Sequence, residues 1–184
     1  MSKARELARS IQCINNLRQL GAAAIGYVYE HEGWFPLANA NRPGGEPELG
    51  MPWYADYAVA SYVGLIRLDK KGPGQCPSDQ AVWEKIFPMR KGLSYGMNEC
   101  LGSAYYVASN EGYRRYETLK NPAATCLFMD ANRYSLIASS PSDAWTFRHQ
   151  CGANVSYADG HCGRIEKKQV PMEMTDVFWD KLSP

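Results

Sequence analysis

Residues 3–29 form an amphipathic stretch long enough to decide how the rest of the chain can fold. Apolar side chains in KARELARSIQCINNLRQLGAAAIGYVY recur with the period of an α-helix. They fall on two neighbouring lines that make one broad stripe, Leu7, Ile11, Ile14 and Ile25 on one and Cys13, Leu17, Leu20 and Ala24 on the other. Arg5, Arg9 and Asn16 are expected on the opposite face. At 1.5 Å per residue this helix would measure about 40 Å, so the remaining elements must pack along its side.

The predicted helix begins without the residues that usually precede one. Ser2, after Met1, is the one residue before it that can act as an N-cap. The pattern is that of a helix cut from a longer one. No apolar run in the sequence approaches the roughly 18 residues that a membrane span requires.

Residues 30–120 are expected to form a loop-rich region with short helices, because proline and glycine recur in its first part. One helix can begin at Pro52, since proline is tolerated in a first turn. Another can be capped by Ser78 or Asp79 and run through Phe87, just before a proline.

Residues 121–184 are expected to form an antiparallel sheet and a C-terminal tail. TCLFMD, residues 125–130, is a short apolar run typical of a buried strand. ANVSYA and HCGRIE flank Asp159-Gly160, which predicts a hairpin with a two-residue turn. No repeat or linker divides the chain, so residues 1–184 are predicted to form a single α+β domain.

The predicted hairpin segment, RHQCGANVSYADGHCGRI, gathers four side chains that can bind zinc: His149, Cys151, His161 and Cys162. His161 and Cys162 are adjacent, so on a strand they point to opposite faces, which counts against all four sharing one ion. A two-residue turn would pair Ala158 with His161 and Tyr157 with Cys162, and leave Cys151 well beyond that pair. A small metal-dependent enzyme at His149 and His161 stays as an alternative.

A catalytic set of Ser156, His149 and Asp159 is disfavoured, because no G-x-S-x-G motif exposes the serine hydroxyl. An Asp before Gly in a hairpin usually serves to tolerate the positive φ of the turn. Asp159 and Gly160 are therefore interpreted as turn residues. His149 is expected to hydrogen-bond across the hairpin, to Asp159 or to a backbone carbonyl. No catalytic residue, metal ligand or cofactor is assigned.

The bulk composition excludes some classes of partner. A formal net charge of +1 leaves no global field to recruit nucleic acid, so no nucleic-acid partner is expected. The chain has 6 cysteines but no C-x-x-C motif, which removes the main indication of a zinc ribbon or a thioredoxin-like site. An even number at wide spacing suits disulfides formed in an oxidising compartment.

Several motifs together resemble those of type IV prepilin-like and type II secretion pseudopilin-like proteins. The N-terminal match consists of Cys13, Asn15, Asn16, Leu17, Gln19, Gly21, Tyr27, Tyr29, Gly33, Trp34, Phe35 and Pro36. QCPSD at 75–79 and SYGMN at 94–98 are similar to two further motifs of that group. His149, nine intervening residues and Asp159-Gly160 resemble its C-terminal H-x9-DG motif. The motifs follow the order of the family along nearly the whole chain.

This resemblance implies a pilin-like fold and a precursor with a leader, a prepilin-peptidase site and about twenty apolar residues before Ser2. That missing helix would anchor the protein in the inner membrane and place its head in the periplasm or at the cell surface. The protein would be a structural subunit and not an enzyme. Its partners would be other pilin-like subunits or secretion-system components. The residues expected to form the assembly helix are Leu7, Ile11, Ile14, Leu17 and Leu20.

The resemblance also implies a disulfide between Cys13 and Cys76, which stand where the family often has cysteines. Cys100, Cys126, Cys151 and Cys162 are outside the common pattern, and their pairing stays open. The calcium site of major pseudopilins is not expected here, because no carboxylate-dense loop repeats its pattern. An extracellular module that binds a glycan or another polymer on a pilin-like scaffold is the alternative function. Trp34, Trp53 and Trp83 would have to line one concave face for that alternative.

Overall fold

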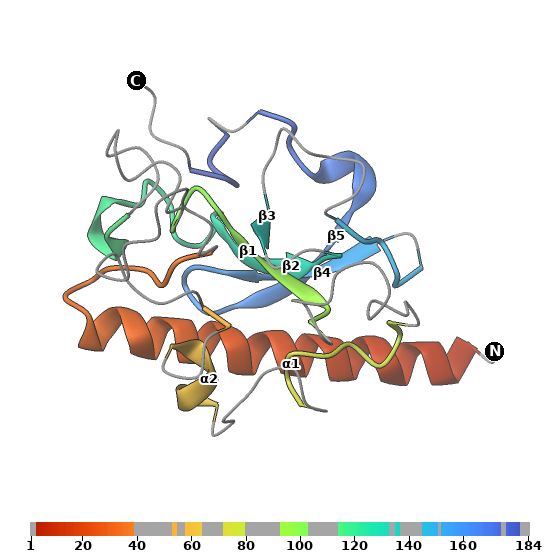
Figure 1. Ribbon diagram of the computed structural model, residues 1–184. Coiled ribbons are helices and arrows are strands. Elements are labelled where there is room, and N and C mark those ends of the chain that lie inside the picture. Colours follow the sequence, from red (N-terminus) through yellow and green to blue (C-terminus); the bar gives the residue numbers. More distant parts are fainter. Residues whose placement is uncertain are drawn as a thin grey trace, which may run out of the picture.

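A long helix lies along one face of a small sheet in the computed structural model (Figure 1). The structure describes residues 3–38, 53–54, 58–63, 72–79, 93–102, 114–132, 135–136, 145–150, 152–173 and 176–180. Helix α1 covers Lys3–Glu30, as its apolar period predicts. Among the described residues no helix combines the length and apolar character that crossing a bilayer demands. The predicted α+β fold with a long N-terminal helix is confirmed.

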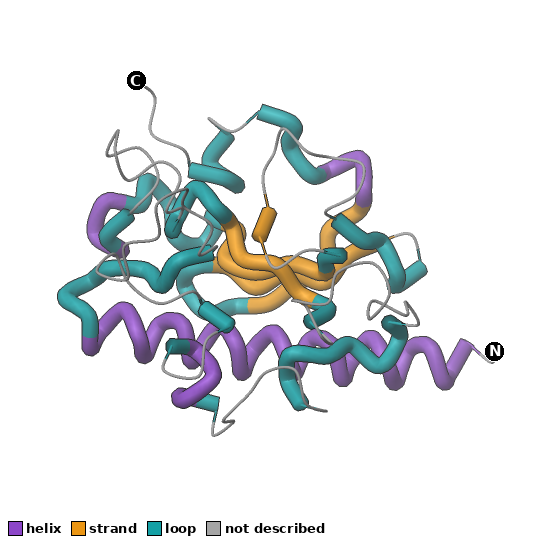
Figure 2. The backbone as a smooth tube through the Cα atoms, in the orientation of Figure 1, coloured by secondary structure: helices purple, strands orange, loops and turns teal. Residues whose placement is uncertain are grey.

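The sheet has five strands in the order β3-β1-β2-β4-β5. Figure 2 shows the sheet above α1. The strands are β1 (Tyr95–Asn98), β2 (Cys126–Asp130), β3 (Ser135–Leu136), β4 (Gly152–Tyr157) and β5 (Cys162–Glu166). Four of them pair antiparallel, and the two-residue β3 runs parallel to β1. Strand β1 falls in the region expected to be loop. All four of its residues are buried, so it lacks the polar-apolar alternation that identifies a half-exposed strand.

Small and polar side chains of β4 let the helix approach the sheet closely. Ala153 and Val155 belong to the core on the far face, so Asn154 and Ser156 point toward α1. A Cβ atom at Gly21 would lie 2.5 Å from Ser156 Oγ. The absence of a side chain at Gly21 therefore sets how close α1 comes to β4.

The C-terminal segment covers the sheet face opposite α1. Trp179 stacks on Trp145 with ring centroids 5.5 Å apart, and Phe178 packs beside it. A buried ion pair between Arg114 and Asp180, 3.3 Å apart, fastens this segment to the rest of the domain. The inner strands β1, β2 and β4 are thus buried on both faces, whereas β5 at the edge of the sheet is largely exposed or half-buried.

Short helices occur in the described parts of the chain outside α1. Helix α2 covers Val59–Tyr62, and a 3-10 turn covers Tyr116–Thr118; a second 3-10 turn, Lys167–Gln169, follows β5. The predicted start of a helix at Pro52 and the predicted helix through Phe87 lie outside the described residues.

The β4–β5 hairpin forms where Asp159-Gly160 predicts it, but its turn has three residues and not two. Ser156 is paired with Cys162, so the expected pairing of Tyr157 with Cys162 was wrong by one residue. Gly160 has a φ of 93°, whereas Asp159 is not among the residues with positive φ. A single left-handed glycine after a type I turn forms a bulge that absorbs the extra residue. Asp159 Oδ1 instead accepts a hydrogen bond from the His161 backbone N–H at 3.1 Å.

Because Gly160 is left-handed, we expect Gly160→Ala to lower the free energy of unfolding by about 1–2 kcal/mol. Gly160→Asn should cost less, since asparagine tolerates this region better than alanine. Urea unfolding of the two variants measures the difference. A Cβ atom at position 160 would lie 3.3 Å from Ile25 Cδ1. Equal losses for the two variants would mean that this close contact, and not the backbone conformation, determines the loss of stability.

Candidate functional site

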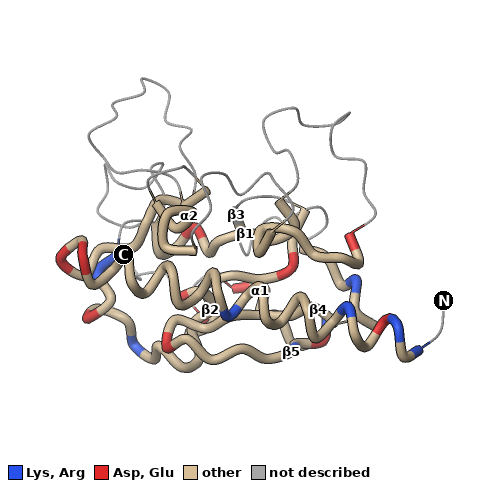
Figure 3. Tube along the Cα trace, turned by 90° about the horizontal axis from the view of Figure 1, so that it is seen from below, with Lys and Arg blue, Asp and Glu red and all other residues tan. Residues whose placement is uncertain are grey.

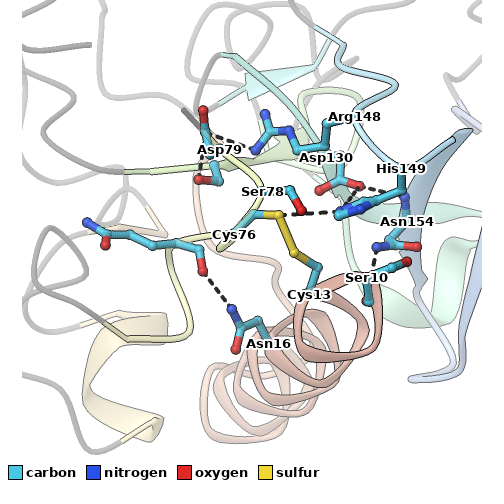
Figure 4. Close-up of a disulfide and its surroundings, with 12 residues drawn as sticks. Ser10, Cys13, Asn16, Cys76, Ser78, Asp79, Asp130, Arg148, His149 and Asn154 are labelled. Carbon is cyan, nitrogen blue, oxygen red and sulfur yellow. Dashed lines mark hydrogen bonds and ion pairs between the residues drawn. A yellow bond between two sulfur atoms is a disulfide. The ribbon is translucent and has the colours of Figure 1, made fainter. Parts of the chain in front are cut away.

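A disulfide between Cys13 and Cys76 joins α1 to the loop at residues 72–79, and polar side chains surround it (Figure 4). This is the pairing that the resemblance implies. Both cysteines are buried, and their Cα atoms are 5.2 Å apart. Asn16, one turn further along α1, donates a hydrogen bond to the Gln75 carbonyl at 2.7 Å. Asn16 is thus buried against the loop, and its expected place on the polar face of the helix was wrong.

His149 is the centre of the polar side chains around this disulfide. Its Nε2 lies 3.3 Å from Cys76 Sγ, and its Nδ1 lies 3.1 Å from Glu6 Oε1. Its backbone exchanges two hydrogen bonds with Gly152, at the start of β4. The expected bond from its side chain to Asp159 was wrong, because the ring reaches away from the turn to α1 and the disulfide.

Glu6 fixes which nitrogen of the ring carries the proton. A carboxylate only accepts hydrogen bonds, so the neutral imidazole donates from Nδ1 to Glu6. Ser78 holds the same oxygen of Glu6 through a hydrogen bond of 3.0 Å. The Nε2 lone pair then faces Cys76. Burial lowers the pKa of His149, and the Glu6 carboxylate partly opposes this, so the neutral ring is favoured.

Asp130, at the end of β2, is the second ionisable group buried here. Its Oδ2 accepts a hydrogen bond from the Asn154 N–H at 2.7 Å and lies 3.7 Å from His149 Nε2. Its Oδ1 is buried and has no hydrogen-bond partner among the described residues. Burial raises the pKa of Asp130 to about 7, although the charge of Arg148 and the Asn154 N–H act in the opposite direction.

Arg148 links the same loop to the sheet. Its Nη1 donates to Asp79 Oδ2 at 2.9 Å, and its Nη2 donates to the Ala131 carbonyl at 2.8 Å. Ser94, next to β1, also donates to Asp79 Oδ2, at 2.7 Å. Arg148 therefore holds the loop through Asp79, and its neighbour in sequence, His149, contacts the same loop at Cys76 Sγ.

Two histidines proposed for one metal site lie at opposite ends of β4. His149 adjoins the first residue of the strand, and His161 follows the turn at its other end. Six residues of strand separate them, about 20 Å at 3.3 Å per residue. His161 is exposed, and its Nδ1 lies 2.6 Å from Asp159 Oδ1 within the turn. The structure thus does not bring His149 and His161 together.

The remaining cysteines are distributed over both faces of the sheet. Cys100 and Cys126 are buried in the core opposite α1, whereas Cys162 packs partly buried against the core on the helix side. Burial raises the pKa of both the Cys126 and the Cys162 thiols, so neither is an activated nucleophile. Cys151 lies outside the described residues.

The residues predicted to form the assembly helix divide between two faces of α1. Leu17 and Leu20 are fully buried in the core against the sheet. Leu7 and Ile11 keep 58% and 52% of their surface exposed, and Ile14 is half-buried. We call Leu7, Ile11 and Ile14 the exposed stripe. Leu7 and Ile11 therefore form an exposed apolar strip on one line of the helix.

The tryptophans considered for glycan binding do not share one open face. Trp53 is fully buried in the core. Trp34 is half-buried, with the Arg115 guanidinium 5.5 Å from its ring centre. Trp83 lies outside the described residues. The burial of Trp53 removes it from any binding face.

Sequence reasoning missed Glu6, Asp130 and Arg148. An aspartate that ends an apolar strand, as Asp130 does in TCLFMD, is one signal for a buried polar contact. Glu6 carries no such signal, because it stands among exposed charges at the start of the helix.

The family model described as "Protein of unknown function (DUF1559)" matches residues 2–65, about a third of the chain. The matched part includes α1, Cys13 and the exposed stripe. That family is associated with pilin-like, prepilin-type proteins, and the match is compatible with a pilin-like surface protein. Neither a curated protein nor a solved structure matches the chain.

Proposed function

We propose that this chain is the head of a pilin-like structural subunit that assembles through the exposed stripe of α1. The observation that carries the proposal is that α1 buries one apolar line and leaves the other in contact with solvent. Leu7 and Ile11 are one helical turn apart on the open line. Burying one such side chain in an interface contributes about 1.5–3 kcal/mol.

The distribution of charge along α1 supports contacts between subunits. Lys3, Arg5 and Arg9 lie at its N-terminal end, whereas Glu30 and Glu32 lie at and just beyond its C-terminal end (Figure 3). In staggered neighbouring subunits, the basic end of one helix would lie near the acidic end of the next. Opposite charges would then fix the register of the assembly.

More specifically, we propose that the chain belongs to a pseudopilin-like protein of a type II secretion or type IV pilus-like assembly. Its partners are other pilin-like subunits or secretion-system components. An apolar helix ahead of Ser2 anchors the precursor in the inner membrane, and the head lies in the periplasm or at the cell surface. The Cys13–Cys76 disulfide supports this location, since such bonds persist in oxidising compartments. In this role the chain is not an enzyme, and its buried His149 serves to hold the helix to the loop and sheet.

A charge in the exposed stripe should break the assembly. We expect Ile11→Asp, introduced into the full-length protein in its own cells, to reduce crosslinking to neighbouring subunits roughly 10- to 100-fold. This range corresponds to the loss of about 1.5–3 kcal/mol from burying isoleucine. The measurement is recovery of crosslinked species with a tagged chain, followed by identification of the partners.

Gln12→Asp is the matched control. Gln12 is exposed like Ile11, follows it in sequence and points about 100° away around the helix. The Gln12→Asp variant should leave crosslinking unchanged. Purified Ile11→Asp and Gln12→Asp proteins should both keep the wild-type thermal stability. Equal crosslinking by Ile11→Asp and wild type would exclude assembly through this stripe.

A further inference from the structure

We propose that the reduced form of this chain binds zinc through Cys13, Cys76, His149 and Asp130, at the place where the disulfide forms on oxidation. This site does not depend on the proposed function. Cys and His side chains are the usual zinc ligands, and an aspartate can supply a fourth. The four come from α1, the loop at 72–79, the segment before β4 and the end of β2. All four side chains are buried.

Three of the ligand atoms, those of Cys13, Cys76 and His149, lie close enough to share one ion, and Asp130 adjoins this group through His149. Zinc bonds of the usual length place neighbouring ligand atoms about 3.3–3.8 Å apart. His149 Nε2 lies 3.3 Å from Cys76 Sγ and 3.7 Å from Asp130 Oδ2. The ligand atoms of Cys13, Cys76 and His149 all lie within 4.8 Å of one another. Once the disulfide is cut, side-chain rotation can part the two sulfurs to about 3.8 Å.

Glu6 already orients the histidine as a metal site requires. Metal-binding histidines usually donate their second ring N–H to a carboxylate, which fixes the ring and the tautomer. The contact of 3.1 Å between His149 Nδ1 and Glu6 Oε1 has this form and leaves Nε2 facing the sulfur atoms. Glu6 would therefore be a positioning residue and not a ligand.

Asp130 provides a second, independent observation that is consistent with a cation at this place. Within the described part of the chain, its Oδ1 is buried without a hydrogen-bond partner, although an unpaired buried carboxylate oxygen is costly. No direct ion pair with a described Lys or Arg satisfies it. A zinc ion bound beside it would supply the positive charge that this carboxylate lacks.

The exchange between zinc and disulfide balances in electrons and protons. A dithiol reductant transfers two electrons to the Cys13–Cys76 bond and becomes a cyclic disulfide, and the two thiols lose their protons when Zn²⁺ binds. Oxidation by a disulfide oxidant reverses this. The two thiolates form the S–S bond, Zn²⁺ is released, and the oxidant takes two electrons and two protons to become a dithiol. Zinc would thus hold α1 to the loop before the disulfide forms.

The test is a cobalt(II) and zinc titration of the purified chain in its reduced and oxidised forms. The reduced chain should bind one ion, with the thiolate-to-cobalt charge-transfer band and the strong d–d bands of a tetrahedral site, and zinc should displace the cobalt. Zinc should also raise the melting temperature of the reduced chain. The oxidised chain, which is folded but has no thiolate at these positions, should show neither effect.

Three variants separate this site from binding by other thiols. Glu6→Gln should keep the thiolate band but weaken zinc binding about 10- to 100-fold. His149→Ala should weaken it further, whereas the double variant Cys151→Ser/Cys162→Ser should bind as wild type. The proposal is wrong if reduced wild type shows no tetrahedral spectrum or stays unfolded with zinc. It is also wrong if His149→Ala binds as tightly as wild type, or if the Cys151/Cys162 variant loses the signal.

Discussion

Replacing both Cys13 and Cys76 by alanine should lower the free energy of unfolding of the oxidised protein by about 4 kcal/mol. The disulfide closes a loop with a sequence separation of 63 residues. In the chain-entropy model, the crosslink stabilises the fold mainly by removing conformations from the unfolded chain, and a loop of this length corresponds to about 4 kcal/mol. The double replacement leaves no single thiol at this position to form a new pair.

Urea unfolding of the oxidised proteins measures this effect and also its origin. Without the crosslink the unfolded chain expands and exposes more surface, so the m-value should rise together with the loss of stability. Cys162→Ala is the control, because Cys162 is a cysteine without a disulfide in the described structure and should cost less than about 1 kcal/mol. A loss from the double variant no larger than that of the control would contradict the expected role of the crosslink.

Arg114→Leu should destabilise the protein by about 3–5 kcal/mol, because it leaves a buried carboxylate without its charged partner. Arg114 and Asp180 have side chains that are 1% and 0% exposed. Arg114 also donates to the Asp180 carbonyl at 2.6 Å and to the Thr118 carbonyl at 2.8 Å. These hydrogen bonds hold the C-terminal segment in place. Loss of the Arg114 side chain should therefore also expose the sheet face beneath Trp179.

A second variant distinguishes the ion pair from simple loss of packing. Asp180→Asn keeps the size of the side chain and tolerates the positive φ of 51° at this residue. The double variant Arg114→Leu/Asp180→Asn should lose less stability than the sum of the single variants, since no unpaired charge stays buried. Glu117→Ala, which removes the neighbouring exposed pair with Arg115, should cost at most about 1 kcal/mol. Strict additivity of the double variant would show that the charges of Arg114 and Asp180 are not coupled.

The elements with a clear local pattern could be predicted from the sequence. The period of residues 3–29 predicted α1 to within one residue of its C-terminal end at Glu30. The apolar run at 125–130 and the Asp159-Gly160 pair predicted β2 and the β4–β5 hairpin. Strand β1 was missed, because burial on both faces removes the alternation by which a strand is recognised.

The turn of the hairpin shows where local prediction ends. Asp-Gly is compatible with both a two-residue turn and a three-residue loop with a bulge. The choice between them shifts the register by one residue, and with it the faces to which all later side chains point. Packing of β5 beside β4 in the completed sheet decided this register, which pairs Ser156 with Cys162.

The residues around the disulfide depended almost entirely on tertiary structure. His149 and Glu6 are 143 positions apart, and His149 and Cys76 are 73 apart. No periodicity relates such positions, so the sequence could propose a role for His149 but not its partners. The resemblance to pilin-like proteins suggested the pairing of Cys13 with Cys76, and only the arrangement of α1, β2 and β4 added Glu6 and Asp130.

The sequence by itself determined that a long amphipathic helix would pack on a small sheet, because helical and strand periods are local properties of the chain. It also placed two apolar lines on that helix without distinguishing them. Which line is buried was decided by the sheet, whose surface accommodates Leu17 and Leu20 and leaves Leu7 and Ile11 uncovered. The physical reason is that burial requires a complementary surface, and that surface exists only after distant strands have paired.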